Sequence, residues 1–246
     1  MDIPVRLSKS LDRLGLSRET GIRKKLNQQL ASLRNEQRLR SVEPAKSFSQ
    51  LGEDAILQAY LPADLGFYVD VGSGSPVAGS NTYALYLRGW RGILVDPIAS
   101  NIELSRKIRP EDQCILTLCG EFSEQTLDFF EFETYQYSTT LAGRAQEMQN
   151  LGHTVRAVYQ LQTTRLSELL PNKLPSGPTV LSIDAEGVEL EILRGNDWDH
   201  FTPEFIIVEE WEPPIRKETP ISTFLEAKGY RLLGFSGVSC LYRLNG

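Results

Sequence analysis

The chain has 246 residues, a net charge of −6 and three cysteines without C-x-x-C spacing. A chain of this length can bury a stable core without disulfides, so Cys114, Cys119 and Cys240 are predicted to be thiols in a reducing compartment. No apolar run approaches membrane-spanning length, and the first residues lack the apolar part of a signal peptide. These features predict a cytoplasmic protein without an integral membrane segment.

Charge is divided unevenly along the chain. Residues 1–46 carry 11 Lys or Arg against 5 Asp or Glu, which leaves 47–246 strongly acidic. An acidic body argues against a nucleic-acid partner. Leucine and isoleucine recur at helical spacing in the basic segment, which predicts an N-terminal helical extension over 1–46. The extension is expected to pack on the body, 47–246, or on a second copy of the chain as a homo-oligomer, with attachment to a membrane surface as the alternative.

Strand and helix patterns alternate along the acidic body. The predicted strands are Phe67–Val71, Gly92–Val95, Cys114–Cys119, Thr126–Phe132, Thr179–Ile183 and Phe205–Val208, followed by a hairpin of Tyr230–Phe235 and Val238–Tyr242. The predicted helices are a short one from Glu53, then Ser80–Leu87, Ile98–Ile108, Thr164–Leu170, Val188–Leu193 and Ile221–Ala227. This order predicts an α/β fold with an open, mostly parallel sheet and one antiparallel strand from the hairpin.

The first strand leads into a turn typical of nucleotide binding. Asp70 lies inside the strand, Gly72 and Gly74 follow it, and Asp96 ends the next strand. Glycines let the backbone approach a ligand closely, and a carboxylate in the position of Asp96 can accept hydrogen bonds from ribose hydroxyls. The third glycine of the dinucleotide pattern is replaced by Val77. Because an acid would repel a pyrophosphate but attract a sulfonium, the pattern favours S-adenosylmethionine (SAM), with an ordinary strand-to-helix turn as the alternative.

Further acids follow the last two central strands, at the edge where such sheets bind ligands. Asp184, Glu186 and Glu209 are predicted catalytic residues, one of which takes the proton of an acceptor hydroxyl. Asp184, Glu209 and Glu210 form an alternative set that could hold Mg²⁺ through oxygen ligands. A third interpretation has Glu186 and Glu189 capping the next helix and Glu210 solvated. His153 and His200 lie in polar stretches and are predicted to be surface residues.

In combination, these segments resemble the FkbM-like family of SAM-dependent methyltransferases. The matching segments are S-Q-L-G-E-D (49–54), G-F-Y-V-D-V-G (66–72), S-N-T-Y-A-L-Y-L-R-G-W-R-G (80–92), V-D-P (95–97), L-S-I-D-A-E-G-V-E (181–189) and I-I-V-E (206–209). The resemblance implies a seven-stranded Rossmann-like sheet and methyl transfer to a hydroxyl oxygen of a sugar, polysaccharide or natural product. It implies cofactor contacts at Gln50, Glu53, Asp70, Gly72, Ser73, Gly74, Asn81, Asp96 and Pro97.

Two other functions remain open from the sequence. The chain could be a non-catalytic SAM-binding partner subunit, or an enzyme that uses NAD or a nucleotide sugar. For a small-molecule or carbohydrate acceptor, residues 122–162 and the C-terminal tail are predicted to shape the pocket. Trp211 is predicted to offer an aromatic face to a sugar.

Overall fold

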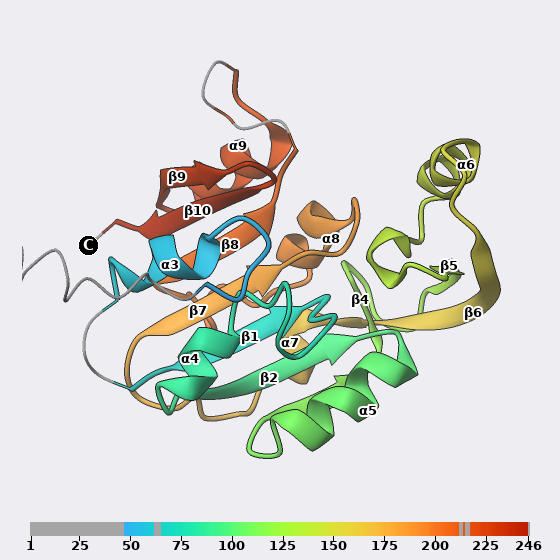
Figure 1. Ribbon diagram of the computed structural model, residues 1–246. Coiled ribbons are helices and arrows are strands. Elements are labelled where there is room, and N and C mark those ends of the chain that lie inside the picture. Colours follow the sequence, from blue (N-terminus) through green and yellow to red (C-terminus); the bar gives the residue numbers. More distant parts are fainter. Residues whose placement is uncertain (1–46, 62–64, 212–213, 215–216, 246) are drawn as a thin grey trace, which may run out of the picture. The chain divides into compact units, whose positions relative to one another are not determined.

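The computed structural model describes residues 47–61, 65–211, 214 and 217–245. The predicted N-terminal extension, residues 1–46, lies outside the described residues. A seven-stranded sheet has the strand order β3-β2-β1-β7-β8-β10-β9 (Figure 1). Its strands are β1 (Phe67–Val71), β2 (Arg91–Asp96), β3 (Gln113–Leu116), β7 (Thr179–Ile183), β8 (Phe205–Glu209), β9 (Tyr230–Ser236) and β10 (Ser239–Leu244). The predicted α/β class and seven-stranded, mostly parallel sheet are confirmed.

The four central strands are parallel and level with one another at their carboxyl ends. Val71 of β1 pairs in register with Val95 of β2 and with Ile183 of β7, and Ile183 pairs in turn with Val208 of β8. The residues that follow these four positions therefore emerge side by side at one edge of the sheet. They are Gly72, Asp96, Asp184 and Glu209.

The antiparallel strand predicted from the C-terminal hairpin is also confirmed. β10 pairs antiparallel with both β8 and β9, so it lies between them, and β9 forms the outer edge. The turn between the two hairpin strands contains Gly237 in a left-handed conformation, which suits glycine.

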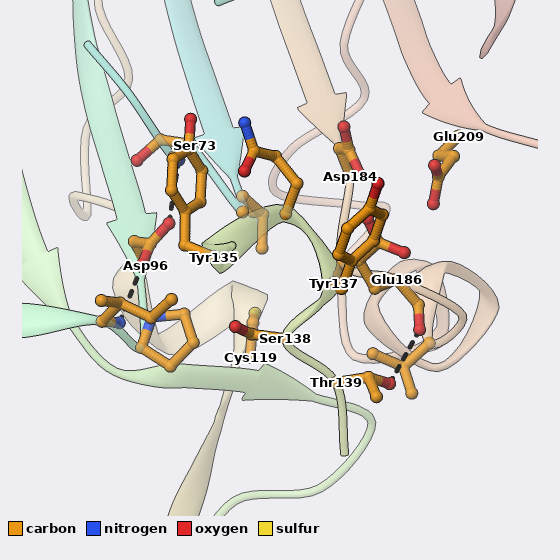
Figure 2. Close-up of a pocket in the computed structure, with 18 of the residues that line it drawn as sticks. Ser73, Asp96, Cys119, Tyr135, Tyr137, Ser138, Thr139, Asp184, Glu186 and Glu209 are labelled. Atoms are coloured by element: carbon orange, nitrogen blue, oxygen red, sulfur yellow. Dashed lines mark hydrogen bonds between the residues drawn. The ribbon is translucent and has the colours of Figure 1, made fainter. Parts of the chain in front are cut away.

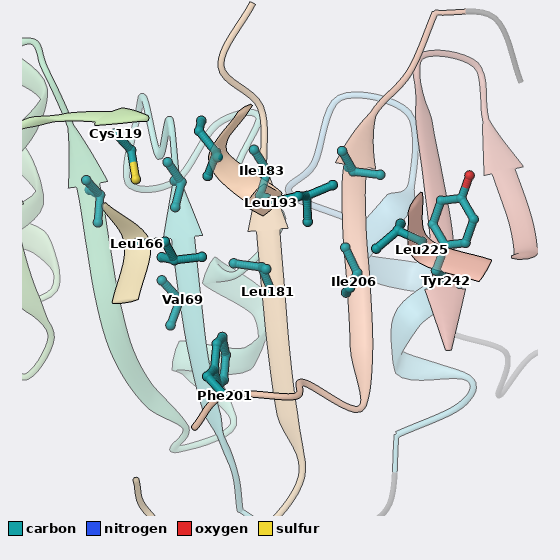
Figure 3. Close-up of a cluster of buried hydrophobic side chains, with 14 of the residues drawn as sticks. Val69, Cys119, Leu166, Leu181, Ile183, Leu193, Phe201, Ile206, Leu225 and Tyr242 are labelled. Atoms are coloured by element: carbon teal, nitrogen blue, oxygen red, sulfur yellow. The ribbon is translucent and has the colours of Figure 1, made fainter. Parts of the chain in front are cut away.

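Helices cover both faces of the sheet, which explains why β1 and β8 are buried throughout. On one face, Val69, Leu181 and Ile206 pack against Leu193 and Leu225 (Figure 3). Leu57 and Leu85 belong to the hydrophobic cluster on the other face.

The helices are α3 (Glu53–Gln58), α4 (Tyr83–Leu87), α5 (Ala99–Ile108), α6 (Ala142–Asn150), α7 (Leu166–Leu169), α8 (Glu189–Arg194) and α9 (Pro220–Ala227). None of the helices in the described residues is both long and apolar enough to cross a membrane.

A second, three-stranded sheet has the order β4-β6-β5 and was not predicted. Its strands are β4 (Leu118–Gly120), β5 (Thr126–Phe132) and β6 (Val155–Arg165), and the chain between β5 and β6 forms the 3₁₀ helix η1 (Tyr135–Tyr137) and α6. We call residues 126–165 the appended segment. Figure 1 shows it beyond the carboxyl ends of the central strands. This position brings η1 and α6 to the edge that carries Asp96 and Asp184.

Two predicted elements are wrong in detail. The single strand expected at Cys114–Cys119 is two strands in different sheets, β3 and β4, because the chain leaves the large sheet at Thr117. The Thr117 hydroxyl is 2.9 Å from the Thr164 hydroxyl in β6. The residue at which the chain leaves the large sheet is therefore hydrogen-bonded to the second sheet. The helix expected at Thr164–Leu170 is only Leu166–Leu169, since Thr164 and Arg165 end β6.

Candidate active site

A cavity of about 650 Å³ lies at the carboxyl edge of the central strands (Figure 2). Its size is within the usual range for small-molecule and cofactor sites. The sequence-predicted site residues that line it are Gln50, Gly72, Ser73, Gly74, Asp96, Pro97, Asp184, Glu186 and Glu209. Figure 2 shows Asp96 on one side of the cavity and the acids Asp184, Glu186 and Glu209 on the other.

The glycine loop, residues 72–75, has every backbone N–H group engaged within the protein. Gly72 and Ser73 both donate to the carbonyl oxygen of Val95, at 2.8 and 3.1 Å. Gly74 donates to Oδ2 of Asp96 at 2.8 Å, and Ser75 donates to the hydroxyl of Tyr135 at 3.2 Å. The side chain of Ser73 differs, because its buried Oγ has no hydrogen-bond partner among the described residues. The loop therefore offers a ligand a free hydroxyl but no free N–H group.

Asp96 is almost completely buried and braces the loop. Its Oδ1 accepts hydrogen bonds from the N–H of Ile98 at 2.8 Å and from Nδ2 of Asn101 at 3.2 Å, while Oδ2 accepts only from Gly74 among the residues that the structure describes. Each carboxylate oxygen can accept two hydrogen bonds, so Oδ2 retains one acceptor position. Burial raises the pKa of this carboxyl to about 6, against the opposing effect of these hydrogen bonds.

Asp70 and Asn81 do not line the cavity, contrary to the prediction from the resemblance. The carboxylate of Asp70 accepts a hydrogen bond from Oγ1 of Thr82 at 2.6 Å, and Nδ2 of Asn81 donates to Oγ of Ser182 at 3.2 Å. Side chains alternate between the two faces along a strand, and Asp70 points to the face opposite that of Val71. Both residues hold the segment 80–82 against the sheet.

Glu53, also predicted as a cofactor contact, is buried at the start of α3 and does not line the cavity. Its Oε2 accepts a hydrogen bond from the N–H of Leu51 at 2.9 Å. Gln50, the residue immediately before Leu51 in the motif S-Q-L-G-E-D, does line the cavity. Within this motif, Gln50 therefore faces the site and Glu53 supports the turn behind it.

Three carboxylates form a compact group on the other side of the cavity. One oxygen from each of Asp184, Glu186 and Glu209 lies within 4.8 Å of the others. Burial, and then the charge of Glu186, raise the pKa of Asp184, while burial and the charge of Asp184 raise that of Glu209. Burial raises the pKa of Glu186 to about 7, although the nearby Arg144 opposes this effect. The three groups therefore cannot all be ionised at neutral pH without a cation.

Glu186 reaches this group through an unusual turn. Its backbone φ of 54° lies in the left-handed region, which is uncommon for residues other than glycine. The carboxylate of Glu189 accepts hydrogen bonds from the N–H groups of Ala185 and Gly187, at 2.9 and 3.0 Å, and so stabilises the turn. Oγ1 of Thr139 donates to the carbonyl oxygen of Glu186 at 2.9 Å. Glu189 thus holds the turn before α8, whereas the third interpretation expected it to cap that helix together with Glu186, and Glu186 instead faces the cavity.

Glu210, predicted as a metal ligand, is not part of the carboxylate group. Its side chain accepts hydrogen bonds from the hydroxyl of Thr219, the N-cap of α9, and from the hydroxyl of Tyr242 at 2.9 Å. Glu210 and Glu209 are adjacent in the chain, so their side chains point to opposite faces. The acid that completes the group is Glu186, and the solvated Glu210 of the third interpretation is also wrong because the residue is buried.

The appended segment supplies cavity walls that the sequence assigned only to a broad range. Tyr135, Tyr137, Thr139 and Arg144 line the cavity, and Trp211 joins them from the chain after β8. The Arg144 guanidinium lies 3.8 Å from Oε2 of Glu186 and 5.6 Å from the centre of the Trp211 ring. The two tyrosines of Y-Q-Y in a polar stretch were the available signal in the sequence. These tyrosines indicate a surface with aromatic character, but they do not indicate that this surface lines the cavity.

Neither histidine lines the cavity. The ring of His153 is half-buried and lies 4.1 Å from that of Tyr137, measured between ring centres. His200 is exposed, and its Nε2 lies 3.0 Å from the carbonyl oxygen of Pro171. Neither histidine can therefore act as a base in this cavity.

Comparison with known protein families gives a match over most of the described residues. The family model described as the Methyltransferase FkbM domain matches residues 70–232, from within β1 to within β9. The chain belongs to this FkbM methyltransferase family. The FkbM match includes the glycine loop, Asp96, the carboxylate group and the appended segment.

Individual relatives are more distant. Methyltransferase sdnD from Sordaria araneosa is 32% identical over 106 residues, which are 39% of this chain and 39% of that protein. The match to this FkbM family member thus spans well under half the length of that relative.

The solved structures that match include two of low sequence identity. The crystal structure of methyltransferase FkbM from Methylobacillus flagellatus has a TM-score of 0.43 at 13% identity, and the match covers 73% of this chain and 43% of that chain. A TehB-like SAM-dependent methyltransferase from Corynebacterium glutamicum has a TM-score of 0.41 at 11% identity, with 90% and 100% covered.

Proposed function

We propose that this FkbM family member is a SAM-dependent O-methyltransferase that acts on a small-molecule or carbohydrate acceptor, such as a sugar, polysaccharide or natural product. The observation that carries the proposal is the register of the central strands. It brings Gly72, Asp96, Asp184 and Glu209 to one edge, around a single cavity.

The cavity fits SAM in three respects. Oδ2 of Asp96 retains an acceptor position for a ribose hydroxyl, and the buried Oγ of Ser73 lacks a partner among the described residues. The carboxylate group suits the positively charged parts of the cofactor. When bound, SAM supplies a methyl group on a cationic sulfur.

A pyrophosphate fits the same site poorly. Dinucleotide sites bind phosphate through free backbone N–H groups of the glycine loop and the helix that follows it. Here the N–H groups of residues 72–75 are all engaged, and α4 begins only at Tyr83. The negative charge that remains on the group of Asp184, Glu186 and Glu209 would also repel phosphate. These features favour SAM over NAD or a nucleotide sugar.

Asp184 is the proposed base for the acceptor hydroxyl. It lies at the end of β7, deep in the carboxylate group, and its raised pKa makes its ionised form a better proton acceptor than an exposed aspartate. Glu209 lies next to Asp184, at the end of β8. Glu186 is the member of the group that contacts Arg144. The neighbouring carboxyls can share the proton that Asp184 takes, which lowers the electrostatic cost of the step.

Magnesium binding by the same three acids is the second candidate role for the group, because carboxylate oxygens are the ligands that Mg²⁺ prefers. A bound Mg²⁺ would favour loss of the hydroxyl proton. Turnover measured after full chelation with EDTA, with and without added Mg²⁺, separates the two roles. Unchanged turnover in EDTA would remove the metal role and leave Asp184 as the base.

Calorimetry with SAM, S-adenosylhomocysteine (SAH) and NAD tests the cofactor assignment. We expect binding of SAM and SAH and none of NAD, and binding of NAD alone would overturn the proposal. Transfer of label from methyl-labelled SAM to a panel of hydroxylated metabolites then tests the activity. SAM binding without transfer to any hydroxylated acceptor, or transfer to nitrogen, would contradict O-methylation and favour a non-catalytic SAM-binding subunit or a different acceptor chemistry.

A further inference from the structure

Tyr135 connects the appended segment to the glycine loop. Its hydroxyl accepts the hydrogen bond of the Ser75 N–H at 3.2 Å. The edge of its ring lies close to Gly74, since a Cβ built on this glycine would be 3.0 Å from Cε2 of the tyrosine. The first three loop N–H groups are held by β2 and by Asp96, whereas the fourth is held by this residue from the appended segment.

The Tyr135 ring also lies at the Asp96 end of the cavity (Figure 2). It is half-buried and lines the cavity together with Asp96 and Asp184. Burial raises the pKa of the Tyr135 hydroxyl, and the negative charges of Asp96 and Asp184 raise it further. Figure 2 shows Tyr135 beside Ser73 and Asp96. A ligand held by Asp96 and Ser73 would therefore lie against this side chain.

The segment that carries Tyr135 is held firmly. Thr139 pairs with Phe130 of β5 through two backbone hydrogen bonds, at 2.9 and 3.2 Å. Oγ of Ser138 accepts from the N–H of Phe132 at 3.0 Å, and Thr139 also contacts Glu186. Tyr135 thus lies beside residues that are held by hydrogen bonds. This reduces the conformational entropy that is lost when a ligand binds.

We propose that Tyr135 is a positioning residue for the cofactor: it holds Ser75 of the glycine loop in place and covers the cofactor part of the cavity. This inference rests on the proposed use of SAM. The hydroxyl fixes the loop, and the ring limits escape of the bound cofactor. Tyr135 takes no part in proton transfer, so its loss weakens cofactor binding and leaves the chemical step intact.

The test compares SAH binding by the native full-length chain, Tyr135→Phe and Tyr135→Ala, using calorimetry for affinity and stopped flow for dissociation. Tyr135→Phe removes only the hydrogen bond to Ser75, and we expect about 3- to 10-fold weaker binding. Tyr135→Ala also removes the cover, so we expect a further loss that appears mainly as faster dissociation. Tyr159→Phe is the matched control, because Tyr159 is an exposed residue of β6 in the same appended segment and does not line the cavity.

The outcomes distinguish failure of this inference about Tyr135 from failure of the proposed function on which it rests. Weaker SAH binding and a raised KM for SAM in Tyr135→Phe, with kcat and the thermal midpoint of the free protein unchanged, would support it. SAH binding equal to that of the native chain in both Tyr135 variants would overturn the inference and leave SAM use standing. A loss of thermal stability in Tyr135→Phe without weaker SAH binding would also overturn it. If the native chain binds neither SAM nor SAH, the proposed function fails as well.

Discussion

Gly72 and Asp184 touch across the ends of neighbouring strands, with no room for a side chain between them. A Cβ on Gly72 would overlap the carbonyl oxygen of Asp184 and lie 2.7 Å from its carbonyl carbon. The Asp184 N–H in turn donates to the carbonyl oxygen of Val71 at 3.0 Å. The glycine loop and the carboxylate group are therefore joined through directly contacting backbone, and a change in one should disturb the other.

Gly72→Ala should destabilise the protein and damage the site. The new methyl group forces strands β1 and β7 apart, and the φ of 73° at this position is unfavourable for alanine. Overpacking of this kind costs about 1–3 kcal/mol, measured as the change in the free energy of unfolding by urea. Gly143→Ala in α6 is the control, because nothing lies within 4 Å of its Cβ position, and it should be neutral or stabilising. Equal effects of the two changes would refute the contact argument.

Asp96→Ala should weaken SAH binding about 10- to 100-fold, since a hydrogen bond to a charged group contributes about 1.5–3 kcal/mol. Part of this loss comes from release of the Gly74 N–H. Asn101→Ala separates the two effects: it removes one donor to Oδ1 and leaves the carboxylate and Gly74 untouched. We expect the asparagine variant to lose much less affinity by calorimetry. Unchanged affinity in Asp96→Ala would reject Asp96 as a cofactor contact.

Asp184→Asn should lower turnover more than cofactor affinity. Loss of a general base typically reduces the rate by about 10²–10⁴, whereas the amide keeps the size of the side chain. The measurement is kcat with a saturating acceptor beside the Kd for SAH. Glu191→Gln, an exposed acid on α8, is the control and should leave both values unchanged. If Asp184→Asn loses SAH affinity but retains kcat, Asp184 belongs to cofactor binding.

The ligand-free protein should become more stable as the pH falls from about 8 to 5. Burial raises the pKa of Asp96 to about 6 and that of Glu186 to about 7, above the values near 4 that are usual for exposed carboxyls. The folded state then binds more protons than the unfolded state in this range, so protonation favours folding. A folded-state pKa that is higher by one than the unfolded-state pKa contributes at most about 1.4 kcal/mol. Thermal midpoints across this pH range test the sign.

Glu186→Gln provides the internal check on that pH profile. The variant removes the group that titrates near pH 7, so the gain in stability between about pH 8 and 6 should shrink while the part near pH 6 from Asp96 persists. A native profile in which stability falls steadily toward pH 5 would contradict the raised pKa values of these buried acids.

The strand ends were predictable because each depends on local pattern. Mostly apolar runs such as Phe67–Val71 and Thr179–Ile183 define the strands, and the parallel order of strands and helices brings Asp96, Asp184 and Glu209 to the same edge. The break at Thr117 was not predictable, since no glycine or proline marks it. What decides it is pairing with β6, a strand that lies far along the chain from β4.

The sequence by itself determined the central parallel strands of the large sheet, their order along the chain and the acids at their carboxyl ends, because hydrophobic periodicity and turn residues act over a few neighbouring positions. Only the tertiary structure decided which of those acids face the cavity. Asp70 and Glu210 point away, and Glu186 points in through a left-handed turn. The same holds for Tyr135, whose place against Gly74 depends on how the appended segment folds back toward the glycine loop. Side-chain direction and long-range contact are set by packing between segments distant in sequence, which local pattern does not encode.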